Sequence, residues 1–208
     1  MNKIVVLISG RGSNMENLVR SNIPGKFILV ASNNPQADGL KRAKNLGIRT
    51  AVVDHKIFPS RQDFDLALAK KLAEYEPDLI LLAGFMRVLS KVFLSRFENK
   101  VLNIHPSLLP AFPGQHTHKK AIKKGVRIHG CTVHFVTPSL DAGPIIVQSA
   151  VSVNQKDDEE SLAKKVLEQE HKIYPIAAKW FLENGSQKNV FLKSIFKSYV
   201  VTTCQNNM

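Results

Sequence analysis

Apolar runs of strand length alternate with segments of helical spacing through the first half of the chain. The runs lie at 4–9, 27–31, 49–53, 78–83 and 101–105. Runs without polar breaks are typical of strands buried on both faces, and strands joined by helices form parallel sheets. Right-handed crossovers bring the carboxyl ends of such strands to one edge. The sequence therefore predicts an α/β fold with a doubly wound, mostly parallel sheet.

The fifth run, 101–105, ends in a loop punctuated by prolines. Pro106 disfavours helical backbone at His105, and the prolines that follow keep the loop from forming a helix. Asn103 and His105 point to the same side because side chains alternate along a strand. A lone loop histidine is more often only solvated. An amide beside an imidazole at a strand end, however, stands where open α/β sheets bind ligands, so we expect the chemistry here.

Gly10 and Gly12 form a turn between the first strand and the helix that follows it. Such a turn can present backbone N–H groups to a phosphate at the amino end of a helix. The dinucleotide-binding fingerprint fails, because its third glycine would fall at Met15, and the lysine of a P-loop is absent. Two interpretations stay open: a phosphate site, or a plain turn in which Ser13 or Asn14 caps the helix.

Two carboxylates are candidates for the site. Asp141 lies in a turn-rich loop at 137–144, where an aspartate usually bonds its own backbone unless the loop folds back on His105. Glu170 falls on the apolar stripe of a long helix expected at 161–183. An inward carboxylate is costly unless paired, so Glu170 is a candidate ligand for an amine, unless it lies at the wet edge of the stripe.

The net charge of +12 among 208 residues is compatible with nucleic acid, an anionic membrane surface or small anionic substrates. The lysines are scattered over the expected helices, without an arginine-rich tract or an aromatic RNA-binding signature. We therefore expect small phosphorylated ligands and no nucleic acid. The absence of a membrane-length apolar segment, together with only two cysteines, predicts a soluble cytoplasmic protein.

Two further histidine patterns occur in the sequence. His116 and His118 could begin a metal site, but no cysteine or carboxylate accompanies them at ligand spacing, so we expect no metal. His134 lies in an alternating run and is interpreted as a packed strand residue. Residues 184–208 contain three lysines and no acid. We expect 1–183 to form one domain and 184–208 a basic extension whose end is disordered.

Several segments of this sequence resemble the folate-dependent formyltransferases. These segments are Ser9–Asn14, Leu82–Arg87, Asn103–Pro110, Pro113–His118, Asp141–Pro144 and Gln169–His171. The resemblance runs from Ile4 to about Phe181. It implies a single-domain, Rossmann-like formyltransferase fold. It also implies transfer of a formyl group from 10-formyltetrahydrofolate to the amine of a phosphoribosylglycinamide in purine biosynthesis, by a monomer or homodimer without metal.

The resemblance assigns a role to each matched residue. The catalytic set is Asn103, His105 and Asp141, and the ribotide site is Gly12, Ser13, Asn14 and Glu170. The formyl-folate site is Arg61, Met86, Arg87, Val88, Leu89, Asn103, Thr137, Pro138, Ser139, Leu140 and Asp141. Pro138 replaces a frequent acid and Leu167 a frequent polar residue of the family, which bears on loop mobility and phosphate contact.

The chemistry of these residue types agrees with the resemblance. Asn103 can donate a hydrogen bond to an oxyanion, and His105 beside Asp141 can donate a second, charge-assisted one. One alternative is a related folate formyl-transfer enzyme or deformylase, which would carry a further domain that we do not expect here. The other is a basic nucleic-acid-binding module, which predicts salt-sensitive binding and no need for the catalytic set.

Overall fold

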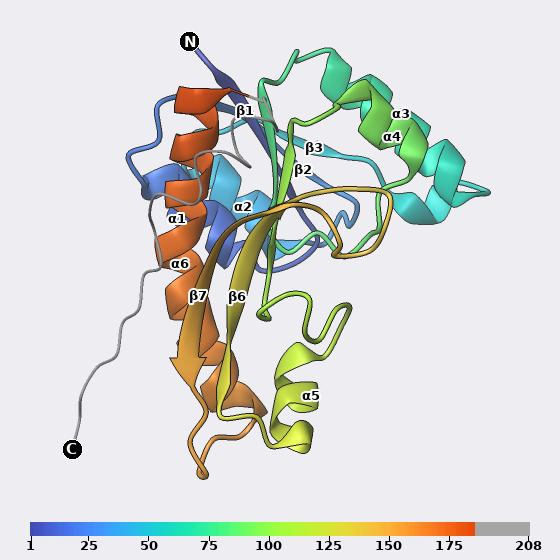
Figure 1. Ribbon diagram of the computed structural model, residues 1–208. Helices are drawn as coiled ribbons and strands as arrows, with labels where there is room; N and C mark the ends of the chain where they lie inside the picture. The colour runs from blue at the N-terminus through green and yellow to red at the C-terminus, as the bar shows by residue number, and fades with distance from the viewer. Residues whose placement is uncertain (186–208) are drawn as a thin grey trace.

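One seven-stranded sheet runs through the molecule, with helices on both faces (Figure 1). The computed structural model describes residues 1–185. Its elements are β1 Lys3–Ile8, α1 Ser13–Arg20, β2 Lys26–Ser32, α2 Asp38–Asn45, β3 Thr50–Val52, η1 His55–Ile57, α3 Arg61–Ala73, β4 Leu79–Leu82, α4 Lys91–Arg96, β5 Val101–His105, α5 Thr117–Lys124, β6 Ile128–Phe135, β7 Ile145–Ser152 and α6 Glu159–Asn184.

The strand order is β3-β2-β1-β4-β5-β6-β7. Pairing is parallel from β3 across to β5, whereas β6 and β7 are antiparallel to their neighbours. This confirms the predicted doubly wound, mostly parallel sheet. The chain winds outward from β1 to β2 and β3, then returns to the other side of β1 for β4. Ligands in such sheets bind beyond the carboxyl ends of the strands near this reversal.

Two hydrophobic cores lie on opposite faces of the sheet. Along β1, Ile4, Val6 and Ile8 belong to the core under α1, α2 and α6, while Val5 and Leu7 belong to the core under α3 and α4. This division follows from the alternation of side chains along a strand. The long α6 lies along β6 and β7 (Figure 1). Both faces of β1 are thus buried, as its unbroken apolar run predicts.

The helix ends differ in detail from the sequence expectation. Of the two interpretations left open for this turn, the one in which Ser13 or Asn14 caps α1 does not hold: both lie inside the helix, and the cap is Gly12, which has a left-handed backbone at φ 77° and makes no side-chain cap bond. A Cβ at Gly12 would come within 2.7 Å of the Gly39 backbone, so the turn requires glycine. Ser60 caps α3 by accepting a hydrogen bond from the Asp63 N–H.

No helix within residues 1–185 is long and apolar enough to cross a membrane. Residues 186–208, most of the predicted basic extension, lie outside the described residues. The division of the chain at 183 and 184 therefore stays a prediction.

Candidate active site

A cavity of about 1030 Å³ opens at the carboxyl ends of β4 and β5. Its walls come from the segment after β4, from the end of β5, from the loop before α5, from β6 and from the loop after β6. The residues that line it are Arg11, Leu82, Gly84, Phe85, Met86, Arg87, Val88, Leu89, Asn103, Ile104, His105, Pro106, Gly114, Gln115, His116, Thr117, His118, His134, Val136, Thr137, Ser139, Leu140, Asp141 and Glu159. The predicted strand-end site is thus a real concavity.

Asn103 and His105 stand together on one wall of this cavity, as their spacing on β5 predicts. The imidazole of His105 is buried, with Nε2 3.1 Å from the carbonyl oxygen of Phe112 in the proline loop. The loop is folded tightly on itself, because the Ser107 hydroxyl donates to the carbonyl of Ala111 at 2.6 Å. The prolines and these contacts together fix the ring orientation.

The loop that carries Asp141 folds back on His105. This is the arrangement that the sequence requires if Asp141 is to belong to the site. Its Oδ2 lies 3.5 Å from Nδ1 of His105 and accepts the Gly114 N–H at 2.8 Å. Asp141 itself has a left-handed backbone, at φ 48°. Two residues on, Gly143 leaves no room for a side chain against the carbonyl of Phe135, so the loop can return close to β6. Imidazole and carboxylate are therefore adjacent.

His134 is a site residue that sequence reasoning missed. It is buried on β6, as expected for a packed strand residue, but it also lines the cavity. Burial lowers its pKa, which keeps the ring neutral at pH 7. With Nδ1 2.8 Å from the carbonyl oxygen of Phe135, Nδ1 is the donor, and Nε2 then accepts from the Asn103 amide at 3.2 Å. His134 thus orients Asn103.

Glu170 and Asn14 meet beside this cavity although 156 residues separate them in the chain. The Asn14 amide donates to Oε2 of Glu170 at 2.7 Å, and Glu170 as a residue is only 7% exposed. Burial raises the pKa of Glu170 to about 7, against the opposing effect of the Asn14 hydrogen bond. The Asn14 Oδ1 atom is buried without a partner among the described residues. The pair has the polar capacity to hold a ligand.

The sequence pattern of the formyl transferase family matches residues 2–178. This chain belongs to that family. It is 45% identical over 184 residues to the phosphoribosylglycinamide formyltransferase of Escherichia coli. The alignment covers 86% of this chain and 87% of that protein. The structure of glycinamide ribonucleotide transformylase 1 from Symbiobacterium toebii has a TM-score of 0.86, at 46% identity and 88% coverage of both chains.

Some relatives of the family are much longer proteins. The chain is 49% identical over 179 residues to the chicken trifunctional purine biosynthetic protein adenosine-3. The alignment covers 84% of this chain but only 18% of that protein. The match spans 13% to 18% of the length of such trifunctional proteins. The family membership confirms the resemblance that the sequence segments indicate.

The structure places the residues of the proposed folate site unevenly. Those lining the cavity are Met86, Arg87, Val88, Leu89, Asn103, Thr137, Ser139, Leu140 and Asp141. Met86 and Leu140 are more than half exposed, so they offer apolar surface to a ligand. Pro138 and Arg61 are outside the lining. Arg61 lies in the first turn of α3, with its Nε 4.0 Å from Oδ2 of Asp65, and its role with folate stays a prediction.

The ribotide residues also lie outside the lining of the main cavity. Gly12, Ser13 and Asn14 follow the lining residue Arg11 directly, and Glu170 reaches them from α6. The residues of the proposed ribotide site thus adjoin the cavity lining in sequence, at Arg11. Their assignment to the two ligands stays a prediction.

Histidines near α5 do not form a metal centre in the structure. Among residues 1–185, no group of three or more His, Cys, Asp or Glu side chains is placed to hold a metal ion. The His118 ring packs edge-on against the buried His129 ring at 5.4 Å between centroids. Burial, followed by repulsion from His118, lowers the pKa of His129 to about 4. These neutral rings pack as part of the support beneath the proline loop.

The buried carboxyl group of Glu170 predicts a pH-dependent stability. Its pKa is about 7 in the folded protein against an ordinary 4.5, so the folded state holds the proton more tightly than the unfolded chain. The contribution of Glu170 to the free energy of unfolding is fully present below about pH 4.5 and is lost as the pH rises through 7. The loss is about 3 kcal/mol at most.

The control for this prediction is Glu170→Gln, which has the size of the protonated acid and can accept the Asn14 hydrogen bond. Denaturant unfolding of both proteins between pH 5 and pH 8 measures the effect. We expect the free energy of unfolding of wild type to fall relative to that of the variant as the pH rises. Parallel profiles would show that Glu170 is ionised across this range.

Proposed function

We propose that this protein transfers a formyl group from 10-formyltetrahydrofolate to the primary amine of phosphoribosylglycinamide in purine biosynthesis. The bond between the formyl carbon and the folate nitrogen breaks, and a bond from that carbon to the amine nitrogen forms. The amine loses one proton and the folate nitrogen gains one. The products are the N-formyl ribotide and tetrahydrofolate.

One observation carries this proposal. Asn103, His105 and Asp141 converge on one wall of a cavity large enough for an extended ligand, in a chain of the formyl transferase family. The named relatives at 43% to 45% identity over most of their length are phosphoribosylglycinamide formyltransferases. A cavity with a few convergent polar groups on a mostly apolar wall is the usual form of such a binding site.

The three residues have complementary parts in the proposed reaction. Attack by the amine turns the formyl carbon tetrahedral and places negative charge on its oxygen, which needs donors at a fixed point. Asn103 supplies an amide donor whose direction His134 holds. His105 supplies a ring N–H, and Asp141 either orients the ring or carries the proton between the two nitrogens through water.

The two ligands would lie on either side of the catalytic set. The apolar segment Met86–Leu89 and the loop before Asp141 suit the flat ring system of the folate. The turn at Gly12 and the Asn14–Glu170 pair suit the phosphate and the amine end of the ribotide. We infer that the enzyme works in the cytoplasm on these two small molecules, as a monomer or a homodimer, without metal or nucleic acid.

A direct assay tests the proposed function. Purified protein is mixed with phosphoribosylglycinamide and 10-formyltetrahydrofolate, and loss of the formyl donor is followed by absorbance. We expect turnover that requires both substrates. Loss of the donor without the ribotide would indicate hydrolysis instead, and no turnover together with salt-sensitive retention of RNA or DNA would favour the nucleic-acid-binding alternative.

A further inference from the structure

Asp65 is a carboxylate inside an apolar core. It lies on α3 beside Phe64 and Leu68, and its side chain is 0% exposed. Its Oδ2 accepts the backbone N–H of Ser90 at 2.6 Å, a short, charge-assisted hydrogen bond. The apolar stripe of α3 gives no reason for an acid at this position. The side chain therefore needs a physical explanation of its own.

The Asp65 carboxylate holds one end of a segment that lines the cavity. Ser90 directly follows residues 84–89, all of which line the cavity wall. The other end is held by Ser9, whose hydroxyl accepts the Met86 N–H at 2.7 Å and whose own N–H donates to the Gly84 carbonyl at 3.1 Å. The segment is thus tied at both ends by residues outside the cavity.

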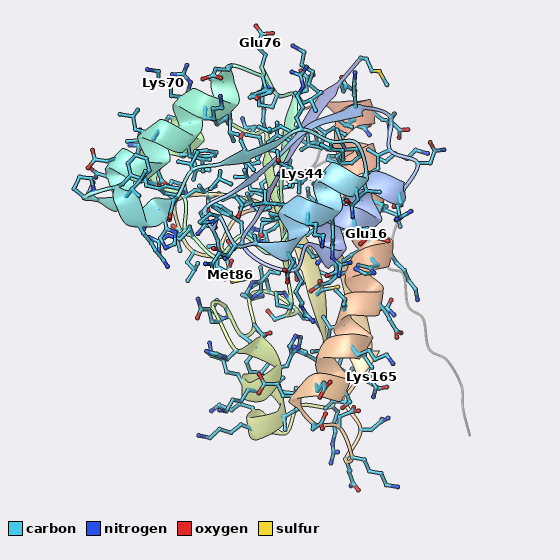
Figure 2. All side chains as sticks on the ribbon, turned by 180° about the vertical axis from the view of Figure 1, so that it is seen from behind. Glu16, Lys44, Lys70, Glu76, Met86 and Lys165 are labelled. Atoms are coloured by element: carbon cyan, nitrogen blue, oxygen red, sulfur yellow. The ribbon has the colours of Figure 1, made fainter. Side chains whose placement is uncertain are left out.

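Between these two ties, exposed side chains alternate with buried ones. Met86 is 63% exposed and Val88 is 40% exposed, whereas Leu89 is buried in the core under α3 and α4. Figure 2 shows Met86 at the margin of the molecule between the parallel strands and α5. The bonds to Ser9 and Asp65 fix the backbone on either side of the exposed Met86 and Val88 side chains.

Asp65 is poorly compensated for a buried charge. Its Oδ1 atom is buried without a hydrogen-bond partner among the described residues, and the nearest cation is the Nε of Arg61 at 4.0 Å. Arg61 is nearly half exposed, so solvent screens this pair. A buried carboxylate in such surroundings lowers stability or adds little to it. Fold stability alone does not explain this residue.

We propose that Asp65 is a positioning residue for the formyl-folate site, and that it fixes the backbone of residues 84–89 through its bond to Ser90. The same carboxylate lies beside Arg61, and so connects that predicted folate residue with the cavity wall. Asp65 touches neither ligand. The proposal rests on the proposed function, because it assigns the segment to the folate.

The test is Asp65→Asn, which keeps the size and an acceptor but removes the charge. A neutral acceptor makes a weaker bond than a carboxylate, so we expect the KM for 10-formyltetrahydrofolate to rise about 3- to 10-fold. The KM for the ribotide and kcat should stay near wild type, and so should the thermal midpoint. Asp65→Ala removes the acceptor altogether and should raise the same KM further.

Two control variants isolate the bond. Asp63→Asn makes the same chemical change on the exposed side of α3. Ser90→Ala removes a buried hydroxyl that has no hydrogen-bond partner among residues 1–185, but it keeps the N–H that Asp65 accepts. Both should leave the folate KM unchanged. If Asp65→Ala does not fold, Asp65→Asn carries the test alone.

The outcomes separate this proposal from the proposed function. Amide hydrogen exchange of residues 86–90 in the free protein needs no activity, and it should quicken in Asp65→Asn. If exchange is faster in Asp65→Asn but the wild-type protein transfers no formyl group, the Asp65–Ser90 bond does hold the segment and the proposed function is wrong. Wild-type exchange and an unchanged folate KM in folded Asp65→Asn would overturn the proposal, as would an equal loss of affinity for both substrates.

Discussion

His105→Ala is expected to lower kcat by about 10²–10⁴-fold, and Asp141→Asn by a comparable factor. His105 lines the cavity, and the Asp141 carboxylate lies 3.5 Å from its Nδ1. Asparagine at 141 can still accept the Gly114 N–H, so the loop should stay in place while the charge is lost. Both losses should therefore appear in kcat rather than in folding.

The two losses should not multiply in the double variant. If His105 and Asp141 act together, removing either side chain already abolishes most of their joint effect on kcat. The double variant should then be nearly as active as the less active single variant. Steady-state kcat of both singles and the double gives the coupling, with circular dichroism as a check on folding. Multiplied losses would mean that the two side chains act independently.

The chain offers a matched histidine-aspartate pair as a control. His55 Nδ1 lies 3.8 Å from Asp54 Oδ1, outside the cavity. His55→Ala removes a ring beside a carboxylate, as His105→Ala does, although the His55 ring is half-buried and the His105 ring is buried. This variant should leave kcat near wild type. A large loss in His55→Ala would show that the assay responds to general damage rather than to the catalytic pair.

The sequence predicts those parts of the site that depend on local pattern. The unbroken apolar runs identify buried parallel strands, and the period of two on β5 places Asn103 and His105 on one side. The helical period of α6 likewise places Glu170 on the apolar face, so the side chain is buried. Periodicity fixes the direction of a side chain relative to its own element, so these predictions hold without knowledge of the neighbours.

Contacts between distant elements are beyond that reasoning. His134 meets Asn103 only because β6 pairs antiparallel with β5 in a register that sets these two residues opposite each other. The Asp65 carboxylate accepts the Ser90 N–H at the start of α4, a contact that the pattern of α3 alone does not predict. Strand direction and helix docking are set by the whole core, and no short segment encodes them.

The expectation that Ser13 or Asn14 caps α1 failed for a similar reason. An asparagine near a helix start usually caps it, but Glu170 provides a buried acceptor that accounts for the Asn14 amide. The close approach of Gly39 then requires glycine at position 12. Local preference gave way to a tertiary contact in the region proposed to hold the ribotide.

Asn103→Ala is expected to lower kcat by about 10²–10³-fold with little change in either KM, because the amide donates to charge that develops only in the transition state. Asn103→Asp should be at least as damaging, since it places a negative group where the oxyanion forms. His134→Ala provides the graded comparison: it keeps the Asn103 amide but removes the ring nitrogen 3.2 Å away that orients it.

The loss in His134→Ala should therefore be smaller than in Asn103→Ala, and nearly absent once Asn103 is already alanine. Single-turnover rates of the two singles and the double measure this directly, because they report the chemical step without product release. A His134→Ala loss that persists in full without Asn103 would mean that His134 acts on the substrates itself. In that case the 3.9 Å separation between its Nε2 and Asp141 Oδ1 would indicate Asp141 as its partner.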